Sequence, residues 1–457
     1  MQEGLENIWF WRELEEGQIH FRDRLQFELK SEFRTEGPST FLQEIYLFIP
    51  ESLQINRRTY SQDQFYLDEI NLIRYKTPSL TFEELLNPAN QASPLNHLTE
   101  AKELKMFANI FRSRVRESVK EIFDSIEAGE DPKLTQEKTL ALIANIRAAK
   151  SAFSTSKSEE KALIEEFLRL VVENYMTGLL YHLRQHQIFQ TDQALSRLIV
   201  DEGLPEAARD PVKEEEVLLR SSQLNKYMYE ALALKNVRVE VKKKHGAWIG
   251  MGAAGVAMLV YMSLFVWKAD TFGINSVPFV MLAVFFYILK DRVKEGLKDL
   301  YQKNAYRWFP DYSTEIETPQ GKSVGFLNES FQFIDEAPED IVHFRERLQN
   351  HDPEEFRTSE SILQYKKELI ITSKEPLELN TIFRYNIHKF VEKAGDEVQV
   401  RLKLNPETFQ IHEKKLPKVY YLTVLLKNTI AAHTELKKFR VILNKSGIER
   451  VQYLVLN

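Results

Sequence analysis

Hydrophobic and polar residues alternate near the start of this chain. Between residues 19 and 30 the odd positions are mostly apolar and the even positions polar. This period of two predicts a half-buried strand, and residues 41–49 and 65–74 predict further strands. A capping box that begins at Thr81 predicts a short helix after them. We therefore expect an N-terminal β-rich domain over residues 1–95.

The apolar residues then recur every three or four positions, which is typical of amphipathic helices. The expected helices cover residues 98–126, 135–153, 158–189 and 192–200, with a last helix that starts near residue 211. Four or five antiparallel helices joined by short loops predict a bundle. We assign this helical bundle to residues 96–245.

Short strand patterns without intervening helices follow residue 310. Residues 382–391 are expected to pair with 398–404, and residues 439–443 with 450–456 around a turn at Gly447. These patterns predict a C-terminal antiparallel β domain over residues 311–457. Whether the N-terminal strands join it stays open at this point.

Two adjacent stretches in the middle of the chain contain no charged residue. They are residues 247–267 and 272–289, which have 21 and 18 residues. A helix needs about 20 apolar residues to cross a bilayer, and its backbone must form its hydrogen bonds internally. We therefore expect a two-helix transmembrane hairpin over residues 246–290 and a basic juxtamembrane helix over 291–310. The expected fold class is an α+β membrane protein.

Cations and tryptophans flank these stretches. The expected membrane-interface residues are Lys242, Lys243, Lys244, Trp248, Trp267, Lys290, Arg292 and Lys294. Because cations are enriched on the cytoplasmic side, both termini are expected there. The single hairpin and the absence of cysteine favour a bacterial inner membrane.

Small residues recur every four positions at the start of the first stretch. Gly246, Gly250 and Ala254 would allow close approach of another helix, either the second stretch or a neighbouring subunit. A homo-oligomer is therefore expected. Residues 250–255 also spell GxGxxG, but a lysine cluster precedes them where the dinucleotide motif needs a strand. No cofactor is expected.

Charge and composition narrow the chemistry. The net charge of −6 argues against a nucleic-acid partner, and the lack of cysteine excludes disulfides and thiolate metal sites. His182 and His186 share a helix face at a spacing suited to zinc. They are weak metal candidates because a third ligand is not identifiable, and a solvated helix face is the alternative.

These observations favour a non-enzymatic, membrane-tethered cytoplasmic scaffold or adaptor that self-associates through the hairpin. Its expected partners are the lipid bilayer and further copies of itself. One alternative is a ligand-responsive effector whose hairpins oligomerise to perturb the bilayer. Another is a membrane-anchored enzyme whose catalytic residues are scattered along the sequence.

Overall fold

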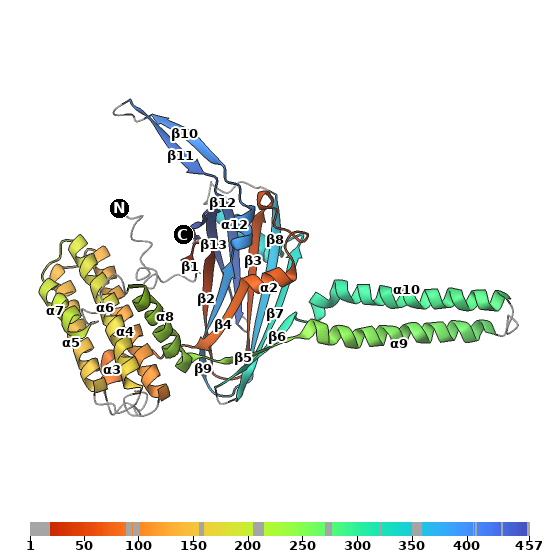
Figure 1. The fold of residues 1–457 in the computed structure, drawn as a ribbon, viewed down its shortest axis with the longest axis horizontal. Helices are drawn as coiled ribbons and strands as arrows, with labels where there is room; N and C mark the ends of the chain where they lie inside the picture. The colour runs from red at the N-terminus through yellow and green to blue at the C-terminus, as the bar shows by residue number, and fades with distance from the viewer. Residues whose placement is uncertain are drawn as a thin grey trace.

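The computed structural model divides the chain into a β-sandwich, a helical bundle and a long two-helix hairpin (Figure 1). It describes residues 19–87, 94, 101–154, 160–203, 214–269, 277–319, 321–349, 359–404, 406, 409–430 and 433–454. Within the hairpin, the side chains of residues 241–250 and 298–308 and of a few other positions lie outside this description.

Two antiparallel sheets form the sandwich. The larger has the order β14 (Gly447–Leu454), β13 (His433–Asn444), β12 (Tyr420–Ile430), β3 (Ser39–Pro50), β8 (Glu360–Ile371), β7 (Ser323–Ile334), β6 (Tyr312–Glu317) and β5 (Lys235–Glu240). The smaller has the order β1 (Ile19–Asp23), β2 (Gln26–Thr35), β9 (Leu377–Asn386) and β4 (Glu69–Tyr75). Apolar side chains from both sheets, such as Phe27, Ile45 and Phe383, fill the space between them.

Both β-rich regions of the sequence contribute strands to both sheets. β3 lies between β12 and β8, and β9 lies between β2 and β4. The N-terminal strands therefore join the C-terminal ones, and the bundle and hairpin are insertions between them. The short helices α2 (Gln62–Asp68), α11 (Glu339–Gln349) and α12 (His388–Lys393) and the 3-10 turn η2 (Glu51–Leu53) complete this part.

Three strand predictions are corrected. The alternating run at residues 19–30 is two strands, β1 and β2, which turn where the Leu25 amide donates to Asp23 Oδ1 at 2.7 Å. The expected strand at 65–74 begins as helix α2, capped by Ser61. Residues 382–391 do not pair with 398–404, because β9 is filled on both edges by β2 and β4.

The bundle matches its prediction closely. It consists of α3 (Phe82–Leu86), α4 (Ala101–Glu127), α5 (Pro132–Ser154), α6 (Lys161–Gln185), α7 (Asp192–Glu202) and α8 (Glu214–Tyr229), followed by η6 (Glu230–Leu232). The apolar face of α4, from Leu104 to Ile122, is buried against α5, α6 and α8. Thr81 and Glu84 form the expected capping box of α3.

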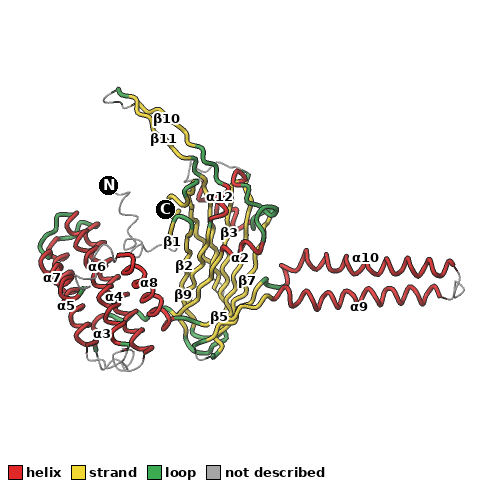
Figure 2. The backbone as a smooth tube through the Cα atoms, viewed as in Figure 1, coloured by secondary structure: helices red, strands yellow, loops and turns green. Residues whose placement is uncertain are grey.

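The hairpin consists of α9 (Val241–Ala269) and α10 (Val277–Trp308), which lie side by side and extend away from the sandwich (Figure 2). The charge-free residues 247–267 and 277–289 are thus helical, residues 272–276 lie outside the described part of the chain, and α10 continues to Trp308 through the basic segment. A further two-stranded ribbon, β10 (Val398–Leu404) with β11 (Ile411–Pro417), projects elsewhere from the sandwich (Figure 1).

The membrane prediction is wrong. Among the described residues, no helix combines the length and the apolarity needed to cross a bilayer. In α10 the helix begins at Val277 and its first charge is Lys290. The described charge-free part of α10 has 13 residues (277 to 289), about 20 Å of helix, whereas a hydrocarbon core is about 30 Å thick. This finding contradicts three predictions: the transmembrane hairpin, the inner-membrane location and the cytoplasmic placement of the termini.

Candidate functional site

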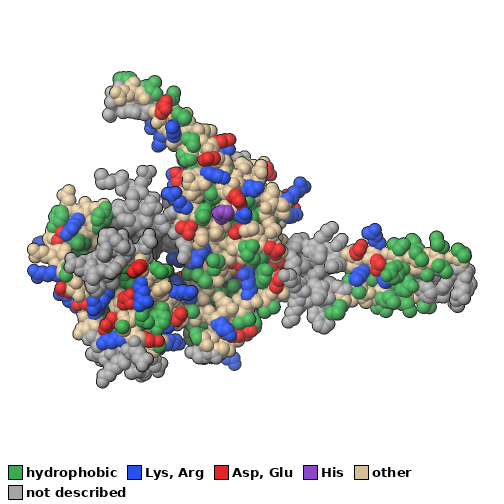
Figure 3. Space-filling view, in the orientation of Figure 1, with side chains coloured by type: hydrophobic (Ala, Val, Ile, Leu, Met, Phe, Trp, Pro, Cys, Tyr) green, Lys and Arg blue, Asp and Glu red, His purple; other side chains and the backbone are tan. Residues whose placement is uncertain are grey.

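The hairpin exposes a large amount of apolar surface, which we call the hairpin surface. Figure 3 shows hydrophobic side chains gathered along the hairpin. The hairpin surface consists of Met251, Val256, Met258, Leu259, Val260, Met262, Val266 and Trp267 on α9 and of Val277, Val280, Met281, Val284, Phe285, Tyr287 and Ile288 on α10. Contiguous exposed apolar surface on this scale marks a site where something else packs.

The two helices bury little against each other. Ala253 and Ala257 on α9 and Phe286 on α10 are the buried apolar residues among the described part of the hairpin. Two small side chains and one large ring are thus the apolar groups that the described part of this helix pair buries. The outer sides of both helices remain open, so packing within one chain leaves the hairpin surface uncovered.

Small residues also lie on the outside of α9. A Cβ atom added at Gly252 or Gly255 would meet no other atom within 4 Å, so both glycines face open space. Of the predicted packing residues, Ala254 is half-buried. The surroundings of Gly246 and Gly250 lie outside the description. An outside partner helix could therefore approach the backbone of α9 at Gly252 and Gly255.

The predicted interface residues lie at the two ends of the apolar part. Trp267 is 69% exposed near the end of α9. Lys290 pairs with Asp291, and Arg292 pairs with Glu295 one turn further along α10. Lys294 is exposed, and the side chains of Lys242, Lys243, Lys244 and Trp248 lie outside the described residues. Their assignment to a membrane interface stays a prediction that no observation supports.

The hairpin is anchored in the larger sheet. The strand that leads into α9 is β5, and the strand that follows α10 is β6, and the two pair with each other from Lys235 to Glu240. Arg238 on β5 reaches two buried carboxylates: its guanidinium lies 3.0 Å from Glu69 Oε1 and 3.3 Å from Glu329 Oε2. We call these three residues the root cluster.

Neighbouring groups hold the root cluster in place. The Arg238 guanidinium lies 4.1 Å above the ring of Tyr312, and Asn71 Nδ2 donates to both carboxylates of the cluster. Burial and the charge of Glu329 raise the pKa of Glu69 well above its usual range, against the opposing effect of Arg238. Glu69 therefore holds a proton more readily than an exposed glutamate does.

Lys367 adds a second buried cation beside this cluster. It lies opposite Glu329 across the β7–β8 pair, is fully buried, and its Nζ makes no hydrogen bond to the described residues. Burial lowers its pKa to about 8, although Glu329 and Glu69 oppose the shift. Glu69, Glu329 and Lys367 are buried, whereas the Arg238 side chain is 38% exposed, and we interpret these charges as an anchor of the hairpin.

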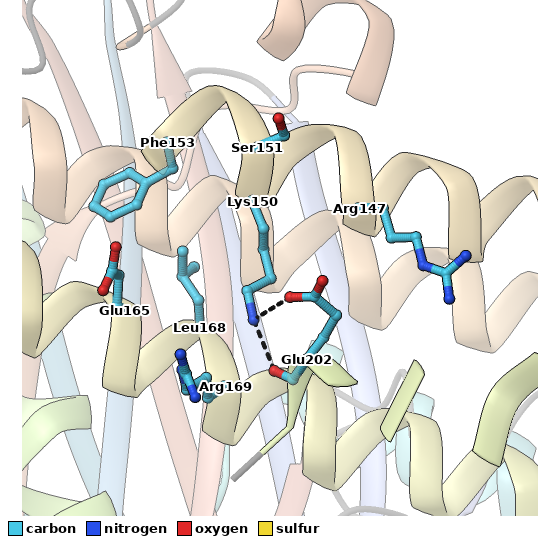
Figure 4. Close-up of a pocket in the computed structure, with 8 residues that line it drawn as sticks. All are labelled: Arg147, Lys150, Ser151, Phe153, Glu165, Leu168, Arg169 and Glu202. Carbon is cyan, nitrogen blue, oxygen red and sulfur yellow. Dashed lines mark hydrogen bonds and ion pairs between the residues drawn. The ribbon is translucent and has the colours of Figure 1, made fainter. Parts of the chain in front are cut away.

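A cavity of about 280 Å³ lies between α5, α6 and α7 (Figure 4). Lys150 points into it and is already engaged, since its Nζ lies 2.7 Å from both the backbone oxygen and Oε2 of Glu202. A cation at this position stabilises the C-terminal end of α7. Arg147, Glu165 and Arg169 complete its charged lining. The contacts of Lys150 favour a structural junction of three helices over a catalytic centre.

The two predicted histidines lie side by side at the C-terminal end of α6, where His186 is the C-cap residue. Their ring centroids are 4.6 Å apart, and His182 is buried against Phe123. Burial, with the neighbouring His186 charge, lowers the pKa of His182 to about 4, which keeps it neutral near pH 7. Among the described residues no third ligand joins them in a group suited to a metal ion. The pair therefore remains a weak metal candidate, and the contact of His182 with Phe123 favours packing.

Comparison of the chain with protein-family models, with curated proteins and with solved structures finds no match. The function is therefore argued from the geometry alone. The sequence did not reveal the root cluster, because Arg238 and its partner Glu69 are 169 residues apart.

Proposed function

We propose that this chain is a non-enzymatic assembly protein whose copies associate through their hairpins. The observation that carries the proposal is the hairpin surface: fifteen large apolar side chains on two helices are exposed to solvent. Leaving them in water is unfavourable by about 25 cal/mol for each Å² of apolar area. Association that covers them is correspondingly favourable.

A second copy of the chain suits this surface. Residues 251–263 of α9 and 277–289 of α10 contain no charge, so two hairpins can pack without repulsion or loss of hydrated ions. The outward-facing Gly252 and Gly255 allow two α9 helices to approach closely. Two hairpins brought together in this way form a four-helix bundle, and a pair related by a twofold axis uses the same surface on both partners.

The sandwich and the bundle fit the role of domains that are held together by the associated hairpins. The root cluster joins the hairpin to the sandwich at β5 and β6, so assembly of hairpins would bring sandwiches and bundles together at defined positions. A protein of this kind concentrates whatever its other surfaces bind.

The proposal is tested by measuring the mass of the purified full-length chain by light scattering over a wide range of concentration. We expect multiples of the 53.6 kDa chain. Replacing Leu259 and Phe285 with glutamate should give the single-chain mass, because it places charges on the hairpin surface. Replacing the equally exposed Leu218 and Leu219 of α8 with glutamate is the matched control and should leave the mass unchanged. Single chains at every concentration would contradict the proposal.

A further inference from the structure

The β10–β11 ribbon is a second exposed element, independent of the hairpin. Its strands pair only with each other among the described strands, so both have an edge of unpaired backbone N–H and C=O groups. Each strand has seven residues, and the ribbon projects from the sandwich (Figure 1). A free edge of this length is a template for another strand.

One face of the ribbon is largely apolar. Val398, Val400, Leu402 and Leu404 are each at least half exposed, and they share a face because side chains alternate along a strand. Ile411, opposite Leu404, extends this apolar face. Glu413 and Lys415, one anion and one cation, lie on the same side opposite Leu402 and Val400.

The other face is basic. Arg401 lies directly opposite Lys414 in the antiparallel pair, and Lys403 follows two residues along β10. Like charges directly opposite each other destabilise a pair of strands. Among the described carboxylates none forms an ion pair with Arg401, Lys403 or Lys414, so within the described residues the basic face has no paired counter-charge.

We propose that the ribbon binds an extended segment of a partner protein in which acidic and apolar residues alternate. Such a segment would add as a third strand at a free edge of β10 or β11, where backbone hydrogen bonds supply affinity. Its side chains would then alternate between the two faces. Acidic residues would extend the basic face and neutralise Arg401, Lys403 and Lys414, while apolar residues would extend the face that carries Leu402.

Charge separates this partner from a second copy of the ribbon. Two basic faces repel each other, and a copy of β10 added at the edge would place further cations beside Arg401. An acidic strand removes the repulsion between Arg401 and Lys414. The ribbon is therefore suited to a different protein, and this inference does not depend on association through the hairpin.

The test uses the full-length chain and a labelled synthetic octapeptide in which glutamate and valine alternate. We expect saturable binding, measured by fluorescence anisotropy. A peptide with four glutamates followed by four valines, and one in which lysine replaces glutamate, should bind more weakly by a factor on the order of ten. Added peptide should also slow hydrogen exchange of backbone amides in residues 398–417, as a paired edge requires.

Two double variants locate the site. R401Q/K414Q should weaken binding of the alternating peptide by a factor on the order of ten. R58Q/K374Q removes two exposed cations elsewhere and should leave binding unchanged. Unaltered circular dichroism would show that both variants are folded. Equal binding of the block and alternating peptides, or equal loss in both variants, would overturn the proposal. So would binding of phosphatidylserine vesicles through Arg401 and Lys414 without any peptide binding.

Discussion

The bundle and the hairpin are both built from long helices, but they treat their apolar residues in opposite ways. α4 buries Phe107, Phe111 and Val115 completely, and charged residues occupy its other faces. α9 is of similar length, yet Leu259 is 70% exposed and no charge occurs among residues 251–263. A helix with one apolar stripe can bury that stripe against other helices of its own chain. A helix that is apolar all round needs a further partner to bury its remaining faces.

The largest difference between the bundle and the hairpin is expected when one apolar side chain is truncated in each. Phe107→Ala leaves a cavity inside the bundle and should lower the free energy of unfolding by about 3–5 kcal/mol. Leu259→Ala should change it by less than about 0.5 kcal/mol at a concentration where the copies are apart. Urea unfolding followed by circular dichroism measures both. Equal losses would mean that Leu259 is packed within its own chain as Phe107 is.

The root cluster sharpens the comparison, since it is the point where the hairpin depends on the sandwich. Arg238→Ala leaves Glu69 and Glu329 without their cation and should cost about 2–3 kcal/mol, less than a fully buried pair because Arg238 is partly exposed. Adding Glu69→Gln should recover part of this loss, because it removes one of the two carboxylates. If the double variant were less stable than Arg238→Ala, the electrostatic role of the cluster would be refuted.

The smallest expected effect is a change in how stability depends on pH. The folded protein raises the pKa of Glu69 above its ordinary value of 4.5, so the folded state holds a proton that the unfolded chain releases. Stability from this group is fully present below pH 4.5 and falls as the pH rises towards the folded pKa.

Glu69→Gln should remove that fall. Its slope is below the limit of about 1.4 kcal/mol per pH unit that the release of one proton sets. Urea unfolding between pH 5 and 7.5 measures the slope. The titration of Lys367 itself, whose pKa is lowered to about 8 from 10.5, changes how stability depends on pH only above about pH 8, outside this range. An unchanged slope in Glu69→Gln would exclude proton uptake by the cluster.

Local patterns predicted the helices well and the sheet pairing poorly. The spacing of Leu104, Phe111 and Val115 is a property of neighbouring residues, so α4 could be placed to within a few positions. The Asn444–Gly447 turn joins β13 and β14 as predicted for the same reason. The pairing of Phe33 with Leu379 joins residues hundreds of positions apart, and no local pattern contains it.

The candidate site divides in the same way. The absence of charge in residues 247–267 and in residues 272–289 indicated two apolar helices, and their described parts belong to α9 and α10. The surroundings of these helices depend on where each helix begins and ends and on which segments pack against it. The run of uncharged residues does not specify either. The finding that no described helix is both long and apolar enough to cross a bilayer overturned the transmembrane prediction. The partnership of Arg238 with Glu69 and Glu329 exists only after β5 has joined the sheet edge.

Because the natural chain contains no cysteine, introduced cysteines can report directly on contact between hairpins. Cysteine would be placed singly at positions 252, 256 and 259 on α9, and at Val200 on α7 as an equally exposed control. After mild oxidation of dilute full-length protein, we predict a disulfide-linked species of twice the chain mass for at least one α9 position and none for Val200→Cys. Failure of every α9 position to cross-link, or equal cross-linking at Val200, would contradict association through the hairpin.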